Sequence, residues 1–451
     1  MTSLWEETGV AVERPALPGD VELDVAVIGA GYTGLWTAYY LAAADPGLRI
    51  GVVEAHAVGH GASGRNGGWC SPRMSGLDSM LADPRSRKAA AALQAEMYRT
   101  VAEIGKVVAD EAIECGWARG GAVVVATRPA MVAKLKGAVA RRRAAGLDEE
   151  GYRWLEPAEA DRHVRMSRNL GATYTPHCAA LQPLSLVQGL AAAVERRGVT
   201  IYEHTEAARI DRGKVVTGRG TVRAPTVIRA TEAWTARLPG SRRELIPLYS
   251  LMVATAPLDA GVWEEIGLGD RQTFADGRHL VIYGQRTEDD RIAFGGRGAP
   301  YHYGSAIEPG FDHDASVFAG LQATLEDLFP ILGGVEVTHR WGGPLGVSRD
   351  WTPTVTFDRD NGVGWAGGYG GQGVGTANLA GRTLADLVLG RNSDLVALPI
   401  VGHRSPMWEP EPLRWIGINA GLRIADSVDR TEAAGGSSTV RAAVLERLVG
   451  L

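Results

Sequence analysis

The chain is poor in cysteine and lacks long apolar runs. Its 451 residues contain only Cys70, Cys115 and Cys178, with no Cys-x-x-Cys pair, which excludes a disulfide scaffold and a cysteine-based zinc site. No window reaches roughly 18 uninterrupted apolar residues, and no basic segment with a following apolar stretch opens the chain. We therefore expect no membrane span and no leader peptide, and a cytoplasmic location.

The chain also lacks an excess of positive charge. Its 47 Lys and Arg residues oppose 52 Asp and Glu residues, a net charge of −5, which excludes a nucleic-acid-binding protein that works through bulk charge. With 45% hydrophobic residues, the chain can bury a large core and form two or three domains. His56 and His60 have the spacing of a helical metal pair, but they lie in a glycine-rich stretch, so we predict no metal site.

Glycine, by contrast, is abundant, with 59 residues gathered in clusters. The first cluster follows an apolar run over 24–28, which has the pattern of a strand buried on both faces. A predicted helix begins near Gly34, and a second predicted strand ends at Glu54. The cluster between the first strand and the helix consists of Gly29, Ala30, Gly31, Tyr32, Thr33 and Gly34.

This strand–glycine–helix–strand pattern is typical of a dinucleotide-binding unit. Gly29 permits the tight turn, Gly31 allows close approach of a pyrophosphate, and Gly34 allows helix and strand to pack closely. The helix N-terminus would face the phosphate charge, and Glu54 would accept hydrogen bonds from ribose hydroxyls.

A second cluster has five glycines within 59–69 and predicts a loop that wraps a ligand with backbone amides. On composition alone, a flexible surface loop is the alternative. Its central residues are Gly61, Ala62, Ser63, Gly64, Arg65, Asn66, Gly67 and Gly68.

These two clusters resemble the D-amino acid oxidase superfamily of FAD enzymes, and within it they are most similar to the gamma-glutamylputrescine oxidases. The resemblance extends over about 380 residues, through 181–183, 230–234, 341–353 and 367–373. It implies an α/β fold with a Rossmann-like FAD-binding domain and a discontinuous antiparallel-sheet substrate domain. We assign 20–92, 148–240 and 336–395 to the FAD domain, 93–147 and 241–335 to the substrate domain, and 396–451 to a C-terminal helical tail.

The resemblance also implies how FAD is held. The backbone of Ala207 would contact the adenine, and a helix preceded by a third glycine cluster would point its positive N-terminus at the flavin. Gln372 stands where the family commonly has His, so a neutral donor replaces a cationic contact there. Arg65 stands where some relatives carry a covalently attached His, and no Cys follows Cys178 where other relatives attach FAD, so we expect noncovalent FAD. The remaining expected FAD contacts are Ala55, Ala230, Trp234, Gly370, Gly371, Gln372, Gly373 and Val374.

The substrate residues are the least specific part of the prediction. Amine oxidation by a flavin needs an oriented neutral amine in a water-poor pocket and no obligatory side-chain base. Aromatic residues usually pack in the core and arginines usually lie in solvent at the surface, so each of these residues has a purely structural role as its alternative. The candidates for an aromatic pocket are Trp69, Tyr249, Tyr283, Tyr301 and Trp341, and those for a clamp on a carboxylate or a phosphonate are Arg73, Arg286 and Arg297.

We expect an FAD-dependent enzyme that oxidises a primary or secondary amine to an imine, with O2 reduced to H2O2. Sarcosine oxidase relatives use a lysine near the flavin for the reaction with oxygen, and none of the five lysines lies beyond Lys214. A dehydrogenase that passes electrons to a quinone or a protein therefore stays open, as does a noncatalytic flavin-binding redox sensor. The sequence does not identify the amine or the oligomeric state.

Overall fold

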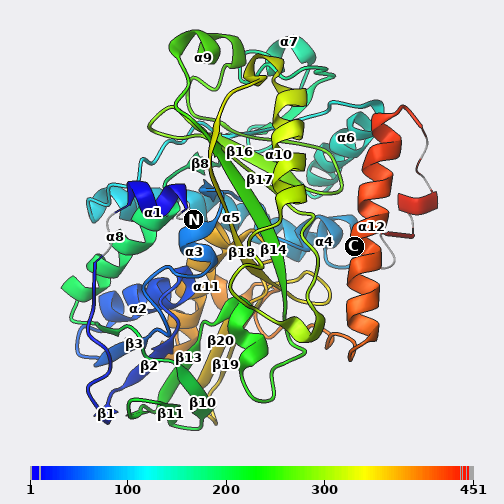
Figure 1. Ribbon diagram of the computed structural model, residues 1–451. Helices are drawn as coiled ribbons and strands as arrows, with labels where there is room; N and C mark the ends of the chain where they lie inside the picture. The colour runs from blue at the N-terminus through cyan, green and yellow to red at the C-terminus, as the bar shows by residue number, and fades with distance from the viewer. Residues whose placement is uncertain (1–2, 10–11, 437, 439, 443, 446–451) are drawn as a thin grey trace.

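The computed structural model describes residues 3–9, 12–436, 438, 440–442 and 444–445. Two large sheets dominate it, one low and one high in the view of Figure 1. The lower sheet has six strands in the order β19 (Thr354–Asp358), β20 (Val363–Gly367), β13 (Thr226–Arg229), β2 (Val25–Ile28), β3 (Ile50–Val53) and β9 (Thr200–Tyr202). All neighbours in it are parallel except β19 and β20.

The six-stranded sheet is the middle of three layers. Val25 and Val27 of β2 pack against helices, whereas Ala26 and Ile28 pack on the opposite face against a small sheet, so all four are buried. The helices are α2 (Tyr32–Ala44), α5 (Arg87–Asp110), α8 (Pro183–Arg196) and α11 (Gly373–Leu389). The small sheet contains β1 (Val21–Glu22), β10 (Ala207–Asp211), β11 (Lys214–Thr217) and β12 (Thr221–Arg223).

The upper sheet has eight strands. Their order is β18 (Val337–Val347), β14 (Ile246–Thr255), β17 (Ile292–Gly296), β16 (Ile282–Arg286), β15 (Thr273–Asp276), β5 (Ala122–Val125), β7 (Ala172–Thr175) and β6 (Arg153–Leu155). We predicted an antiparallel sheet, but β15 and β5 are parallel. They come from separate stretches of chain, so no tight turn forces them to run in opposite directions.

Side chains along β14, the second strand of this sheet, alternate between its two faces. Tyr249, Leu251 and Val253 of β14 face an apolar cluster with α9 (Ala260–Ile266) and α10 (Ala315–Leu328). Met252 and Ala254 face the short N-terminal helix α1 (Leu4–Thr8). The period of two in β-strands thus separates an outer core from the face that looks toward the glycine clusters.

Three strands belong to a different sheet from the one that the predicted domain bounds imply. β6 and β7 fall within 148–240, and β18 falls within 336–395, yet all three belong to the eight-stranded sheet. α5, which the division cuts near residue 92, is one continuous helix packed with the six-stranded sheet. Short apolar strands carry no signal for which sheet they join, which explains these differences.

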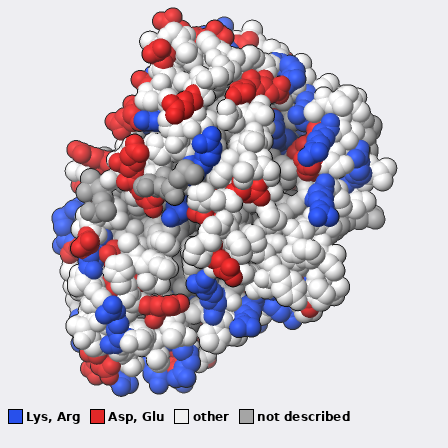
Figure 2. Space-filling model, viewed as in Figure 1, with Lys and Arg blue, Asp and Glu red and all other residues white. Residues whose placement is uncertain are grey.

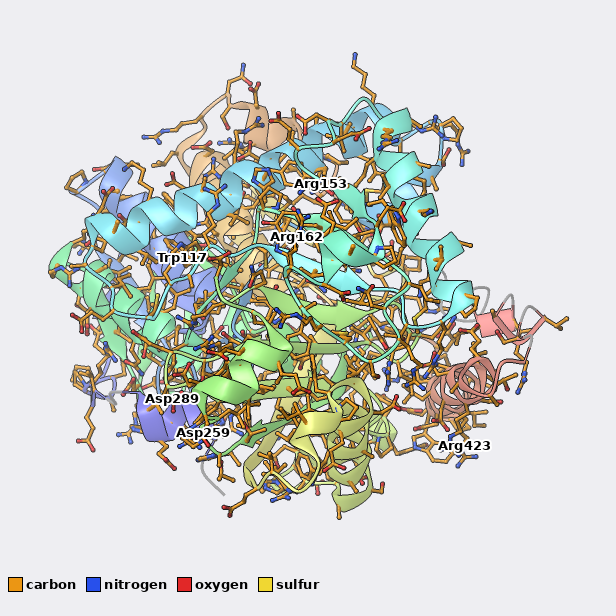
Figure 3. The ribbon with its side chains drawn as sticks, turned by 90° about the horizontal axis from the view of Figure 1, so that it is seen from above. Trp117, Arg153, Arg162, Asp259, Asp289 and Arg423 are labelled. Atoms are coloured by element: carbon orange, nitrogen blue, oxygen red, sulfur yellow. The ribbon has the colours of Figure 1, made fainter. Side chains whose placement is uncertain are left out.

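Small elements complete the fold. The remaining helices are α3 (Ala62–Arg65), α4 (Leu77–Ala82), α6 (Pro129–Ala144), α7 (Pro157–Ala160) and α12 (Leu413–Ala433), and the short 3-10 turns include η1 (Glu232–Arg237). β4 (Trp69–Cys70) and β8 (Ala179–Ala180) form a two-stranded ribbon. Seen from above, α12 lies at the edge of the molecule with Arg423 exposed (Figure 3). Acidic and basic residues are interspersed on the face in Figure 2.

Candidate functional site

The turn between β2 and α2 requires its glycines. Gly29 has a φ of +106°, and a Cβ there would lie 2.5 Å from the carbonyl oxygen of Ala230. A Cβ on Gly34 would lie 2.0 Å from the Gly29 oxygen, so the helix packs against its own turn. Gly31 is the N-cap of α2 and has no side chain to cap the helix, so the Tyr32 amide in the first turn donates instead to the Ser63 hydroxyl at 2.9 Å.

Glu54 closes this turn from the end of β3. Its Oε2 accepts the Ala30 amide at 2.8 Å, and its Oε1 accepts the His56 amide at 2.9 Å. Burial raises the pKa of the carboxyl above its ordinary value. Each oxygen keeps a further lone pair, so the carboxylate still has acceptor capacity for a hydroxyl in the cavity that Glu54 lines.

The second glycine-rich loop is held by side chains from distant elements. Trp5 of α1 donates to the Asn66 oxygen at 2.8 Å, and Trp341 of β18 donates to the Arg65 oxygen at 3.0 Å. Gln285 of β16, which is fully buried, donates to the Gly67 oxygen at 2.8 Å. These hydrogen bonds therefore fix the backbone of the loop in place. The sequence analysis missed Trp5 and Gln285, although a glutamine inside an apolar strand was a signal for the latter.

We expect Trp5→Ala to loosen this loop. The indole is 2% exposed and packs edge-to-face on Trp341, so its loss should lower the free energy of unfolding by about 3–5 kcal/mol. Chemical denaturation checks this value. Val12→Ala, at an N-terminal residue that is 47% exposed, is the control and should change stability little. Equal stabilities for Trp5→Ala and the unmodified chain would contradict the assignment.

One cavity runs from the β2–α2 turn to the inner face of the eight-stranded sheet. Most of the predicted FAD residues line it, namely Gly29, Gly31, Tyr32, Thr33, Glu54, Ala55, Gly61, Ala62, Ser63, Arg65, Asn66, Gly67, Ala207, Ala230, Trp234, Gly371, Gln372, Gly373 and Val374. Five others lie behind this wall and shape the turns, namely Ala30, Gly34, Gly64, Gly68 and Gly370. Gly64, for example, packs against the Gly59 oxygen, which a Cβ would approach to 2.4 Å.

The substrate end brings together some of the predicted residues. Trp69, Tyr283, Arg73 and Arg297 all line the cavity. The rings of Trp69 and Tyr283 are edge-to-face at 6.3 Å, and the Tyr283 hydroxyl hydrogen-bonds to Ser250 at 2.8 Å. Among the residues that the structure describes, the buried Trp69 indole N–H has no hydrogen-bond partner, so an acceptor inside the cavity would satisfy it.

Four other candidates do not line the cavity, which corrects our expectation. Tyr249 points to the outer face of β14, toward His302 and Phe311, because strand residues alternate. Trp341 faces inward but is covered by α1. The other two are occupied elsewhere, Tyr301 with Ser305 and Glu411, and Arg286 with Asp290 and Trp263.

Two of the arginines that line the cavity, Arg73 and Arg297, lie at its substrate end and lack acidic partners within the described residues. Arg297 donates to the Gly370 oxygen, and its guanidinium lies over the Trp351 ring at 4.9 Å. Burial, together with the charge of Arg73, lowers the pKa of Arg297. Within the described part of the chain, neither arginine forms an ion pair with a carboxylate. Two such cations facing one cavity favour an anionic group between them.

Glu232 is a cavity-lining residue that the sequence analysis passed over. Its carboxylate accepts the amides of Gly368 at 3.0 Å and Tyr369 at 3.3 Å. Burial raises the pKa of this carboxyl to about 7. Glu232 has a φ of +39°, a backbone conformation that is unfavourable for a residue with a Cβ. This conformation is evident only in the folded structure.

This raised pKa predicts a pH dependence for the apoprotein. The native state keeps the proton up to about pH 7, whereas the unfolded state releases it near 4.5, so stability falls as pH rises across that window. The shifted pKa of Glu232 changes the free energy of unfolding by at most about 3 kcal/mol over this window. We expect Glu232→Gln to flatten the fall, measured by urea unfolding at several pH values between these limits. An identical pH profile for the two proteins would contradict the assignment.

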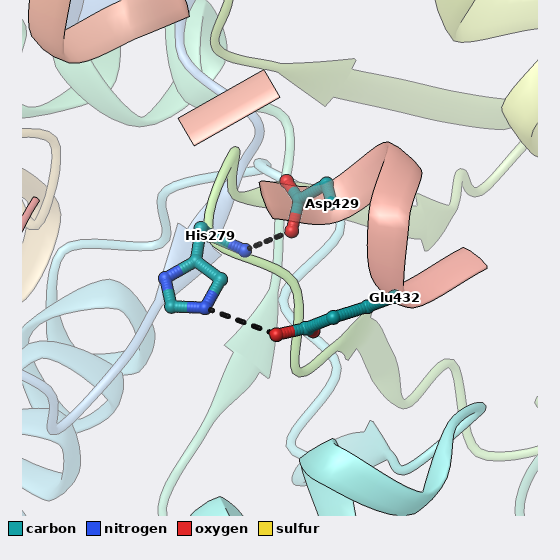
Figure 4. A group of neighbouring side chains, drawn as sticks. All are labelled: His279, Asp429 and Glu432. Atoms are coloured by element: carbon teal, nitrogen blue, oxygen red, sulfur yellow. Dashed lines mark hydrogen bonds and ion pairs between the residues drawn. The ribbon is translucent and has the colours of Figure 1, made fainter. Parts of the chain in front are cut away.

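α12 is tied to the edge of the cavity. Asp429 accepts the amides of His279 at 2.9 Å and Leu280 at 2.8 Å, and Glu432 lies 4.0 Å from the His279 ring (Figure 4). The next residues, Val281 and Ile282, line the cavity. Both carboxylate oxygens of Asp429 accept hydrogen bonds from the backbone of this loop, and Glu432 lies beside the His279 ring. These contacts fix the tail helix to the eight-stranded sheet.

Comparison with known proteins adds to this geometry. The family model described as DAO, FAD dependent oxidoreductase, matches residues 24–387. A probable oxidoreductase OrdL of Rhizobium meliloti is 31% identical over 415 residues, 87% of this chain and 89% of that protein. The gamma-glutamylputrescine oxidoreductase of Escherichia coli is 29% identical over 379 residues, 82% of this chain and 84% of its own length.

Solved structures show the same fold. Glycine oxidase from Geobacillus kaustophilus superimposes with a TM-score of 0.70 at 22% identity and covers 85% of this chain and 99% of its own. L-proline dehydrogenase from P. horikoshii gives a TM-score of 0.68 at 20% identity, with 85% and 96% covered. Over the described residues, we find no helix that combines the length and the apolar character needed to cross a membrane.

Proposed function

Because the chain belongs to the DAO family of FAD-dependent oxidoreductases, we propose that it oxidises the C–N bond of an amine that also carries an anionic group. The guanidiniums of Arg73 and Arg297, which lie at the substrate end of the cavity without acidic partners among the described residues, are the observation that carries this choice of substrate. The imine formed would be hydrolysed by water to a carbonyl product and a smaller amine or ammonia, and O2 would be reduced to H2O2.

The residues present fit FAD. The glycine cradle at 29–34 has no room for a Cβ at Gly29 or Gly34, the first turn of α2 lines the cavity, and Glu54 keeps acceptor capacity beside it. When bound, FAD supplies the two-electron acceptor. We propose noncovalent binding, because Cys70, Cys115 and Cys178 are buried outside the cavity lining and Arg65 is engaged with Asp312 at 3.2 Å.

The chain's own residues would orient and desolvate the amine. Trp69 and Tyr283 present aromatic faces that exclude water, and burial raises the pKa of the Tyr283 phenol, which keeps it protonated. Arg73 and Arg297 attract the anionic group, and the same positive charges disfavour an ammonium ion next to them. The amine therefore binds in its neutral form, which is the form that can be oxidised.

The first test is an anaerobic titration of the purified flavoprotein with γ-glutamylputrescine, putrescine, glycine and sarcosine. We expect the visible flavin absorption to bleach with amines that carry a carboxylate and to persist with putrescine, which lacks one. Bleaching by putrescine alone would overturn the proposed substrate class. A flavin that no amine bleaches would overturn amine oxidation and favour the redox sensor.

Electron transfer to another acceptor is the second candidate. It is favoured by the composition of the cavity wall, in which the described residues include no lysine. Oxygen uptake during turnover supports the oxidase, whereas turnover with an artificial dye and without oxygen uptake supports a dehydrogenase. We place the protein in the cytoplasm, a location supported by its three free, buried cysteines.

A further inference from the structure

Glu232 lies where the two sheets meet at the cavity. It is the first residue of η1, directly after β13 and the cavity-lining Ala230 and Thr231. Its carboxylate turns toward the loop that follows β20, where it accepts the amides of Gly368 and Tyr369. Its left-handed backbone, with a φ of +39°, is a conformation that residues with a Cβ rarely adopt, so the position is locally strained.

The carboxylate fills a cradle made of glycines from both sheets. A Cβ on Gly346 of β18 would lie 2.8 Å from Oε1, and a Cβ on Gly367 of β20 would lie 2.8 Å from Oε2. Within the part of the chain that the structure describes, no cation pairs with Glu232. A buried, unpaired carboxylate is costly, and backbone amides are its compensation here.

The loop held by Glu232, residues 367–372, contacts both the first turn of α2 and Arg297 at the cavity wall. The hydroxyls of Tyr369 and Thr33, a residue in the first turn of α2, hydrogen-bond at 2.8 Å. The Gly370 oxygen accepts from Arg297, and Gly371 and Gln372 line the cavity just before α11 begins. The position of this loop therefore sets the position of the α11 N-terminus and of the Arg297 guanidinium.

We propose that Glu232 is a positioning residue that fixes loop 367–372 and thereby determines how tightly the chain binds FAD. This inference rests on the FAD dependence of the family and not on the identity of the amine. Removal of the carboxylate leaves the amides of Gly368 and Tyr369 without their acceptor, so the loop and the α11 N-terminus lose their fixed place beside the flavin.

The test measures FAD binding to the apoprotein by quenching of flavin fluorescence. We expect Glu232→Gln and Glu232→Asn to raise the Kd for FAD at least about tenfold and to alter the visible circular dichroism of the bound flavin. Glu232→Asp, which keeps the charge, should restore part of the affinity. Glu264→Gln is the control, because it removes an exposed carboxylate from α9, which contributes no residue to the cavity wall, and its Kd should stay within about twofold.

The stability of the apoprotein distinguishes a positioning role of Glu232 from a purely structural role. Asn tolerates the left-handed backbone and removes the buried charge, so the melting temperature of apo Glu232→Asn at pH 8 should match or exceed that of the unmodified chain. A lower melting temperature with unchanged FAD affinity would overturn the proposal, as would an unchanged Kd with native flavin circular dichroism. Gly346→Ala pushes on the same carboxylate from β18 and should also weaken FAD binding, a check that leaves residue 232 intact.

Discussion

Gly29→Ala will yield a protein with almost no bound flavin. The residue has a φ of +106°, and the new methyl group would lie 2.5 Å from the Ala230 oxygen, so β2 and β13 cannot keep their spacing at the turn. We expect FAD affinity to fall more than about 100-fold, measured as the ratio of flavin to protein absorption after purification and by titration of the apoprotein.

Two further variants make this result interpretable. Gly31→Ala meets only the Ser63 hydroxyl, at 2.9 Å, which is able to rotate away, so it should fold normally and bind FAD about tenfold more weakly. Gly261→Ala, in α9 where nothing lies within 4 Å, should change neither flavin content nor stability. Full flavin occupancy in Gly29→Ala would contradict the glycine cradle.

Arg297→Met will lose activity selectively toward acidic amines. The guanidinium is buried, lines the cavity and lacks an acidic partner, so its removal should cost about 2–5 kcal/mol of interaction with an anionic substrate group. We expect kcat/KM to fall at least about 100-fold for a carboxylate-bearing amine and less than about threefold for a neutral one. Steady-state kinetics with matched pairs of amines measures this split.

Arg286→Met is the matched control for this experiment. Arg286 also lies in the eight-stranded sheet, but it pairs with Asp290 at 2.6 Å and lies over the Trp263 ring instead of facing the cavity. Its kinetics should stay within about twofold of the unmodified enzyme. Equal losses for acidic and neutral amines in Arg297→Met would contradict an anion-binding role, and Arg73→Met should repeat the selective loss.

The sequence predicted the lining of the glycine-rich end of the cavity better than the lining of its aromatic end. The glycine motif at 29–34, Glu54 and the loop at 61–68 form local patterns, since each is set by a turn and the elements next to it. Tyr249 and Trp341 are aromatic residues on strands, and their direction depends on register and on what covers each face. Those are properties of the assembled sheet, which a single sequence does not encode locally.

Glu232 and Gln285 are residues of the cavity region that local sequence patterns did not predict. Gln285 is buried and Glu232 is half-buried, and the partners of each lie more than 100 positions away in the chain. Glu232 acts on the loop after β20, and Gln285 on the loop after α3. Residue type alone does not reveal such partners, because the hydrogen bonds form only when the two sheets meet.

The order of the strands along the chain has a consequence for synthesis. The six-stranded sheet begins with β2 near residue 25 but is completed only by β19 and β20, near residue 367, and α11 covers it last. A nascent chain therefore lacks one wall of the cavity until most of it has left the ribosome. The complete cavity therefore forms only after nearly all of the chain has been made, and FAD that binds there adds its binding energy to the stability of the folded apoprotein.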